Sequence, residues 1–312
     1  MILELPDTST GAISRKIDEL HEERGEAALG RVLTLLIVTD TAHLEESLEV
    51  ANAASREHPC RVIAIVMDGH VATDISDHSS TLDGQIRFGA DAGAGEIIVL
   101  KPTSALTRHL DTLVIPLLVP DAPVVAWWPT RAPENPSADP IGRMARSRIT
   151  DAMHAPNPEA AFTALRAHYS DQDVDLSWTR LTIWRALLAT MLDQPPHLPI
   201  TGVRVVGPTN DIPTELLVSW LALRLGVPVS VERDPDANAV QGVYFRREDG
   251  EVALLRPADD QATIRQPGQA DQTMSMPARP LEDCLSEELR RLDPDEIYAE
   301  VITKGWALVD HE

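Results

Sequence analysis

Cysteine and long apolar runs are both scarce in this 312-residue chain. It holds two cysteines, Cys60 and Cys284, far apart and outside any Cys-x-x-Cys pair. This usage argues against a disulfide framework and favours a reducing compartment, although one bond between the two thiols stays open. The longest apolar run, residues 113–119, is broken by Pro116 and is too short to span a bilayer. The first residues, MILELPD, carry acids where a secretion signal needs bases. We therefore expect a soluble cytoplasmic protein.

Basic residues are also few. There are 27 Lys and Arg against 49 Asp and Glu, a formal net charge of −22. A field of this sign repels nucleic acid and anionic membranes, so neither is expected as a partner. The 43% hydrophobic fraction is enough to build real cores, and the length suits two domains.

Motifs that carry chemistry are missing. The sequence has no Gly-Lys-Ser/Thr, no Gly-x-Ser-x-Gly and no His-Glu-x-x-His. A glycine-rich stretch at 89–95 precedes an expected strand, whereas a dinucleotide fingerprint must follow one. The loop at 68–78 holds two His and three Asp and could bind a metal, but such loops are usually turns. We predict no catalytic residue, no cofactor and no metal.

One weak ligand site stands out. Lys101, Thr103 and Ser104 lie where an expected strand ends before an expected helix. In α/β proteins this is where phosphates bind. These three residues are the candidate phosphate or ligand site.

The first half alternates strands and helices. Residues 31–39 and 61–67 are continuous apolar runs, typical of parallel strands buried on both faces. A helix over 42–57 joins them, which gives a right-handed βαβ unit. We expect further strands at 83–88, for which a position at the sheet edge is open, and at 96–100 and 124–128, with helices at 103–113 and 157–170.

The second half repeats this theme with fewer elements. Expected strands at 203–206 and 227–231 flank a helix over 213–225, and a turn at 249–250 separates two antiparallel strands. The predicted fold is α/β: two Rossmann-like three-layer units with mostly parallel sheets, the second smaller and partly antiparallel. We place an N-terminal domain at 1–170 and a C-terminal domain at 171–312.

The C-terminal domain should open with a Trp-rich helix that starts at Asp175 (DLSWTRLTIWRALLA). Trp and Arg often anchor protein contacts. Trp184 shares an apolar stripe with Leu181, Leu188 and Met191, and a core or a partner-binding role is about equally expected for it. Trp178 lies in the first turn beside Arg180, and this position favours a place on a partner or interdomain surface.

A second Trp pair lies in PVVAWWP at 123–129. Adjacent residues of a strand point to opposite faces. If Trp127 is in the core, Trp128 faces another layer or a partner and could be half exposed; burial of both is at least as probable. The candidate partner-binding residues are Trp128, Trp178, Arg180 and Arg185.

At these motifs the chain resembles the actinobacterial family of glucose-6-phosphate dehydrogenase assembly proteins, OpcA. The resemblance rests on 123–129, 175–185 and the strand that starts at Arg31, and extends over nearly the whole chain, including SRITD at 147–151. It implies a non-catalytic accessory protein whose partner is the dehydrogenase of the oxidative pentose phosphate pathway. The alternative is an enzyme or sensor on a Rossmann-like scaffold that binds a sugar phosphate or nucleotide. Self-association is left open.

Overall fold

The chain forms two compact units in a computed structural model that describes residues 1–24, 32–67, 81–88, 95–103, 105–258, 260–309 and 311. The first unit comprises Met1–Pro156, Ala167–Val174 and Leu281–Pro294. The second comprises Asn157–Arg166, Asp175–Pro280 and Asp295–Glu312. Each unit is thus built from three segments, whereas the boundary predicted at 170 and 171 divides the chain only once. No helix in the described parts is long and apolar enough to cross a lipid bilayer.

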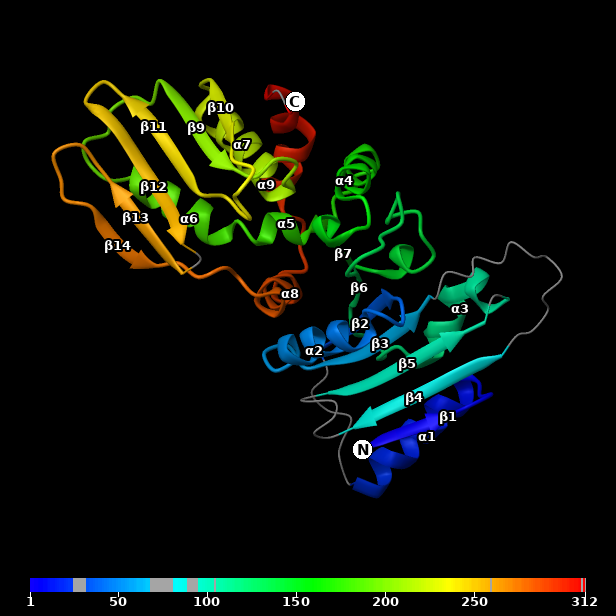
Figure 1. The fold of residues 1–312 in the computed structure, drawn as a ribbon. Helices are drawn as coiled ribbons and strands as arrows, with labels where there is room; N and C mark the ends of the chain where they lie inside the picture. Colours follow the sequence, from blue (N-terminus) through cyan, green and yellow to red (C-terminus); the bar gives the residue numbers. More distant parts are fainter. Residues whose placement is uncertain are drawn as a thin grey trace. The chain divides into compact units, whose positions relative to one another are not determined.

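Within the described residues, the first unit contains an eight-stranded sheet of order β1-β4-β5-β3-β2-β6-β7-β8 (Figure 1). The strands are β1 (Ile2–Leu5), β2 (Leu33–Thr39), β3 (Cys60–Val66), β4 (Leu82–Phe88), β5 (Glu96–Pro102), β6 (Val124–Trp128), β7 (Ser147–Thr150) and β8 (Asp173–Asp175). The helices are α1 (Thr10–Arg24), α2 (Leu44–Ala54), α3 (Leu110–Val114) and α8 (Leu281–Arg290).

The centre of this sheet is parallel, as the apolar runs predict. β2 pairs in parallel with β3, with Leu35 opposite Val62, and also with β6, with Ile37 opposite Trp127. β2 and β3 are buried almost throughout. This confirms the predicted βαβ unit. Three strands of this sheet, β1, β7 and β8, are not predicted from the sequence. β1 pairs antiparallel with β4, so β4 is not at the sheet edge. The four residues of β1, ILEL, are too few to show the alternation of polar and apolar residues that predicts a strand.

Helices cover both faces of the first sheet. Residues of α1 and α3 form a buried cluster with one face of the central strands, including Trp128 of β6. On β6, Trp127 points to the opposite face, because neighbouring residues in a strand alternate. α2 packs against α8 as well as against β2 and β3. The result is the three-layer arrangement that the sequence predicts.

Within the described residues, the second unit contains a smaller, six-stranded sheet of order β10-β9-β11-β12-β13-β14 (Figure 1). Its strands are β9 (Gly202–Gly207), β10 (Val229–Arg233), β11 (Gly242–Arg247), β12 (Gly250–Ala258), β13 (Gln261–Arg265) and β14 (Gln272–Ser275). Its helices are α4 (Pro158–Ala167), α5 (Leu176–Thr179), α6 (Thr182–Leu192), α7 (Ile212–Leu225) and α9 (Glu296–Glu300). β9 and β10 pair in parallel and the other pairs are antiparallel, so the predicted fold class is confirmed.

The longest helix of the second unit, α7, packs against β9 and β10 and also against α5 and the segment that follows α9. Its residues are apolar around much of its circumference, as a helix covered on several sides requires. Asp211 begins it: the carboxylate accepts the N–H of Thr214 at 3.0 Å. Gly226 ends it in the left-handed conformation, with φ of 63°, which glycine adopts without steric cost.

The Trp-rich segment is two helices rather than the single one predicted. Asp175 begins α5, where its carboxylate accepts the N–H of Ser177 at 2.9 Å. Leu181 then has ψ of −1°, in the bridge region, and α6 starts after it. The apolar stripe predicted for this segment is confirmed, because Leu181, Trp184, Leu188 and Met191 are all buried.

Candidate functional site

The parallel strands of the first unit define where a ligand site belongs. From β2 the chain continues to β3 and β5 on one side, and it returns to place β6 and β7 on the other. In open α/β sheets, ligands bind outside the carboxyl ends of the strands at such a switch point. Here the switch point lies between the ends of β2 and β6. The turn that follows β2 is therefore the first place to examine.

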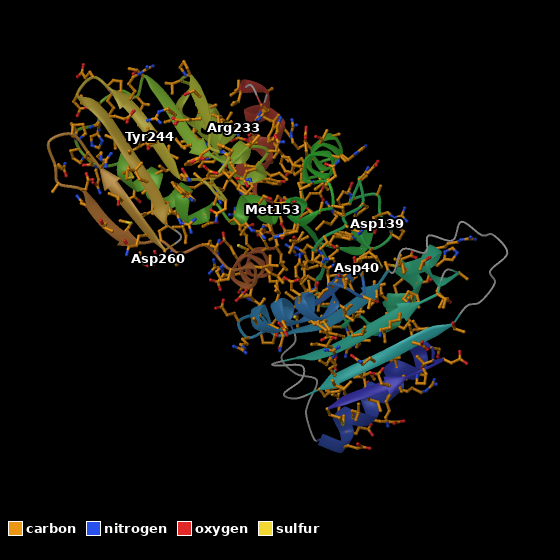
Figure 2. The ribbon with its side chains drawn as sticks, viewed as in Figure 1. Asp40, Asp139, Met153, Arg233, Tyr244 and Asp260 are labelled. Atoms are coloured by element: carbon orange, nitrogen blue, oxygen red, sulfur yellow. The ribbon has the colours of Figure 1, made fainter. Side chains whose placement is uncertain are left out.

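That turn is occupied by a carboxylate of the chain itself. Oδ1 of Asp40 accepts the backbone N–H of His43, the residue that begins α2, at 3.0 Å. The same Oδ1 also lies 2.6 Å from Nδ1 of the His43 ring. Nε of Arg131, in the loop after β6, lies 3.9 Å from Oδ2. Burial of Asp40 opposes ionisation, but the hydrogen bonds from His43 and the charge of Arg131 hold the pKa of this carboxyl below its usual value. Figure 2 marks Asp40 at this point of the fold.

The consequence concerns phosphate binding. A dinucleotide-binding domain leaves the N-terminus of this helix open and glycine-rich, so that the pyrophosphate can approach its N–H groups. Residues 40–43 contain no glycine, and an ionised carboxylate accepts the N–H of His43, the residue just before the first turn of α2. A negatively charged ligand at this position would be repelled.

A second Asp–His pair follows β7. Nδ1 of His154 lies 2.8 Å from Oδ2 of Asp151, a carboxylate whose side chain is fully buried. In both pairs, Asp40–His43 and Asp151–His154, the carboxylate lies three residues before the histidine and contacts Nδ1 of its ring. In the described parts of the chain, no group of three or more His, Cys, Asp or Glu side chains is arranged to hold a metal ion. The 68–78 loop lies outside the described residues.

The predicted phosphate residues are placed at the end of β5. Lys101 is exposed on that strand. The hydroxyl of Thr103 donates to the carbonyl of Thr81 at 2.9 Å and accepts the N–H of the same residue at 3.0 Å, so it ties two chain segments together. Ser104 lies outside the described residues. A ligand role for these three residues stays a prediction.

Trp178, for which the sequence favours a partner or interdomain surface, is buried within the second unit. Its side chain is 1% exposed. Its Nε1 donates to Oδ2 of Asp295 at 2.9 Å, the guanidinium carbon of Arg185 lies 3.7 Å from its ring centroid, and the ring of Tyr298 lies 5.9 Å away. Arg185 is therefore partly committed to Trp178 through a cation–π contact. Arg180, at the end of α5, is half-buried.

Trp128 is likewise a core residue. It is 2% exposed and packs with Ile141 and residues of α1 and α3, so of the two alternatives the burial of both Trp residues is confirmed, and Trp128 is not half exposed. Trp127 is fully buried on the opposite face, as alternation predicts. Of the four candidate partner-binding residues, Arg180 and Arg185 keep some exposed surface, and a partner role for the set stays a prediction.

Sequence reasoning missed one polar cluster in the second unit. Glu215 on α7 contacts Arg233 of β10 and Nδ1 of His311, each at 2.5 Å. The imidazole of His311 stacks on the indole of Trp306 with ring centroids 3.9 Å apart. The guanidinium carbon of Arg166 lies 4.1 Å from the centroid of the Trp306 ring. The available signal was an aromatic residue and a histidine in an acidic C-terminal segment, which is too general to predict these contacts.

The strand order and the turn after β2 define a class: a Rossmann-type α/β protein whose usual phosphate position is filled by its own carboxylate. Comparison with known proteins specifies the family. Models of the N-terminal and C-terminal domains of a glucose-6-phosphate dehydrogenase subunit match residues 51–167 and 171–302. The chain belongs to this family, OpcA.

A curated relative carries the same family name. A Synechocystis protein described as an OxPP cycle protein, OpcA, is 24% identical in an alignment of 244 residues, and the match covers 69% of this chain and 48% of the relative. The chain thus spans about half the length of that protein.

Two solved structures resemble the chain more distantly. A 3-ketoreductase from Actinomadura kijaniata in complex with NADP, KijD10, is 12% identical, with a TM-score of 0.48 over 88% of this chain and 95% of that one. A glucose-6-phosphate dehydrogenase bound to glucose 6-phosphate is 9% identical, with a TM-score of 0.35 over 90% and 91%. At this level of similarity neither carries an argument about activity.

Proposed function

We propose that this chain is a non-catalytic accessory protein that promotes the assembly and activity of glucose-6-phosphate dehydrogenase in the oxidative pentose phosphate pathway. It acts in the cytoplasm as an allosteric activator, through protein–protein contact. The observation that carries this proposal is the match of two consecutive domain models of a glucose-6-phosphate dehydrogenase subunit.

The turn after β2 supports the non-catalytic part. Asp40 is held ionised at the N-terminus of α2 by His43 and Arg131. Cofactor phosphates bound there would meet the like charge of Asp40. The chain should therefore leave catalysis to its partner.

The net charge supports a protein partner of a particular kind. At −22, the chain favours contact with basic patches on another protein. Contact between opposite charges of this kind weakens as salt is added. We therefore expect the complex with the dehydrogenase to dissociate more readily at high ionic strength.

The test is reconstitution with the purified dehydrogenase. Initial rates of glucose 6-phosphate oxidation are measured while the full chain is titrated in, and an unrelated protein of similar charge serves as control. We expect saturable activation and co-elution of the two proteins. Failure to co-elute, or no change in rate, would remove the proposal.

The same material tests the enzyme alternative. If the chain were an enzyme or sensor with a sugar-phosphate or nucleotide site at Lys101, Thr103 and Ser104, NADP or glucose 6-phosphate would raise its melting temperature in the absence of the dehydrogenase. We expect no such shift. A shift abolished by Lys101→Ala would favour the alternative.

A further inference from the structure

The C-terminal segment of the second unit is held against α7. Two short helical turns, Val301–Gly305 and Trp306–Leu308, follow α9, and both pack on α7 (Figure 1). The fit is close at Gly305, where an added Cβ would lie 2.8 Å from the carbonyl oxygen of Ser219. Beyond these turns, the imidazole of His311 also contacts α7. The bonds of His311 therefore decide how firmly the end of this segment is attached.

Both ring nitrogens of His311 face oxygen acceptors. Nδ1 lies 2.5 Å from Oε2 of Glu215 on α7, and Nε2 lies 2.9 Å from the backbone carbonyl oxygen of Trp306. A carbonyl oxygen cannot donate a hydrogen bond. The other oxygen of Glu215 lies 2.5 Å from a guanidinium nitrogen of Arg233, and this ion pair favours the ionised carboxylate, which also only accepts. The imidazole must therefore supply a proton at each nitrogen.

Only the charged form of the imidazole has two N–H groups. A neutral ring carries one N–H and one acceptor lone pair. With its proton at Nδ1, the lone pair of Nε2 would face the carbonyl oxygen of Trp306; with its proton at Nε2, the lone pair of Nδ1 would face the carboxylate of Glu215. Either neutral form leaves one hydrogen bond unmade and two acceptors in contact, which is unfavourable. The arrangement is that of the imidazolium cation.

The indole of Trp306 also favours the charged ring. The imidazole of His311 lies on it with the two planes 13° from parallel and the ring centroids 3.9 Å apart. A cation above an aromatic face is attracted by the electron density of the ring. The guanidinium carbon of Arg166 lies 4.1 Å from the same centroid, and two groups at these distances do not fit on one face. Trp306 is therefore enclosed between the two, with the imidazole on one face.

The charged groups around this contact act in both directions. Glu215 touches the imidazole directly and favours its positive charge. The other titratable or charged groups that the structure describes here act through Glu215 or across the indole: Arg233 of β10, Arg166 of α4, Asp211 at the start of α7 and Tyr298 of α9. The two arginines oppose a charge on His311, but the carboxylate at 2.5 Å is nearer to it than either.

We propose that His311 is a proton-dependent latch, which holds the end of the C-terminal segment on α7 when both ring nitrogens carry a proton and releases it when one proton is lost. The side chain is 18% exposed, so the proton passes to solvent. A contact made by the cation alone stabilises at low pH, and this stability is lost as the pH rises. The latch goes beyond the role proposed above, because it lies within the second unit and needs no dehydrogenase.

Tryptic cleavage after Lys304 reports whether the latch is open. The Lys304 side chain is 66% exposed, but Gly305, on the other side of the bond, is packed against α7, so cleavage requires the segment to leave this helix. The released C-terminal fragment is quantified by mass spectrometry for the wild type and His311→Phe at about pH 6 and about pH 9, between which histidine ordinarily loses its charge. Dividing the two rates at each pH cancels the pH dependence of trypsin.

The expected result is protection that depends on pH. At about pH 6 the wild type should be cleaved at least about tenfold more slowly than His311→Phe, which keeps the stacking but has neither N–H donor. Most of this protection should be lost at about pH 9. A ratio of rates that is the same at both pH values would overturn the proposal, as would equal rates at the lower pH.

Glu215→Gln tests the mechanism from the other side. Its amide oxygen still accepts from Arg233, and its amide N–H₂ donates to Nδ1 of a neutral His311 whose Nε2–H reaches the carbonyl of Trp306. This variant should therefore stay protected at about pH 9, where the wild type opens. Protection that falls with pH as steeply as in the wild type would assign the pH dependence to another group and overturn the proposal.

A matched control changes a histidine of the first unit. His43 also contacts a carboxylate through Nδ1, that of Asp40. His43→Phe should be cleaved after Lys304 at the wild-type rate at both pH values. Melting temperatures of all variants at each pH separate release of the segment from unfolding of the whole chain. Wild-type protection lost in His43→Phe, without a fall in melting temperature, would contradict the assignment to His311.

Discussion

The indole Nε1 of Trp178 donates a hydrogen bond of 2.9 Å to Oδ2 of Asp295, 117 residues further along the chain. The other oxygen of this carboxylate accepts the N–H groups of Ile297 and Tyr298 and so begins α9. One aspartate thus joins the start of the last helix to the Trp-rich segment. The indole is in the second unit's core, which changes what a substitution there should do.

Trp178→Ala should destabilise the chain by about 3–5 kcal/mol, the usual cost of truncating a buried Trp. Trp184→Ala should cost a similar amount, because Trp184 is only 5% exposed. The measurement is urea unfolding of each variant, followed by intrinsic fluorescence. A Trp178→Ala protein as stable as the wild type would mean that Trp178 is not part of the core.

Trp178→Phe is the matched control for the hydrogen bond. It keeps most of the packing and removes the Nε1 donor, while Asp295 still caps α9. It should therefore lower the free energy of unfolding by less than Trp178→Ala does.

Much of the fold follows from local patterns. The runs in β2 and β3 predict buried parallel strands, since only a strand covered on both faces needs apolar residues at every position. The stripe of Leu181, Trp184 and Leu188 predicts the buried side of α6 in the same way.

The failures have a common cause. β1 and β14 are short edge strands with polar residues, and their pairing is decided by the neighbouring strand rather than by their own sequence. Trp178 stands beside Arg180 in sequence, which suggests a surface, but Asp295 and Tyr298 enclose it from a distant segment. Likewise, the sequence around Asp40 predicts only a helix cap. That its carboxylate stands where a phosphate would bind follows from the strand order, which the local sequence does not give.

The two cysteines should be inert in the folded chain. Both thiols are buried with 0% exposure, and burial raises the pKa of Cys60 to about 12. Because the thiolate is the reactive form, a thiol reagent at pH 8 should label neither residue until the protein is unfolded. Counting labelled thiols by mass spectrometry, with and without urea, checks this. Rapid labelling of Cys60 or Cys284 in native protein would contradict it.

The pKa of Asp40 should depend on His43. Burial raises the pKa of Asp40, but the hydrogen bonds and charge of His43, together with a smaller charge effect of Arg131, hold it below the ordinary value. A carboxyl with a lowered folded-state pKa contributes stability that is present above its unfolded pKa and is lost as the pH falls through the folded value. In His43→Ala the pKa of Asp40 should rise, and in Arg131→Ala it should rise less. Carbon NMR titration of the side chain measures both. Equal values in the wild type and His43→Ala would refute this account.

His311 should stabilise the second unit through three contacts. Its Nδ1 lies 2.5 Å from Oε2 of Glu215, its Nε2 lies 2.9 Å from the carbonyl of Trp306, and its ring stacks on the Trp306 indole. Hydrogen bonds to charged groups contribute about 1.5–3 kcal/mol and an aromatic pair about 0.5–1.5 kcal/mol. Because the imidazole is partly exposed, we expect His311→Ala to lower the free energy of unfolding by about 2 kcal/mol. His311→Phe keeps the stacking and removes the bond to Glu215, so it should cost less than His311→Ala. Urea unfolding of the wild type and both variants measures the differences. If His311→Ala unfolds at the same urea concentration as the wild type, the cluster of Glu215, Trp306 and His311 does not stabilise this unit.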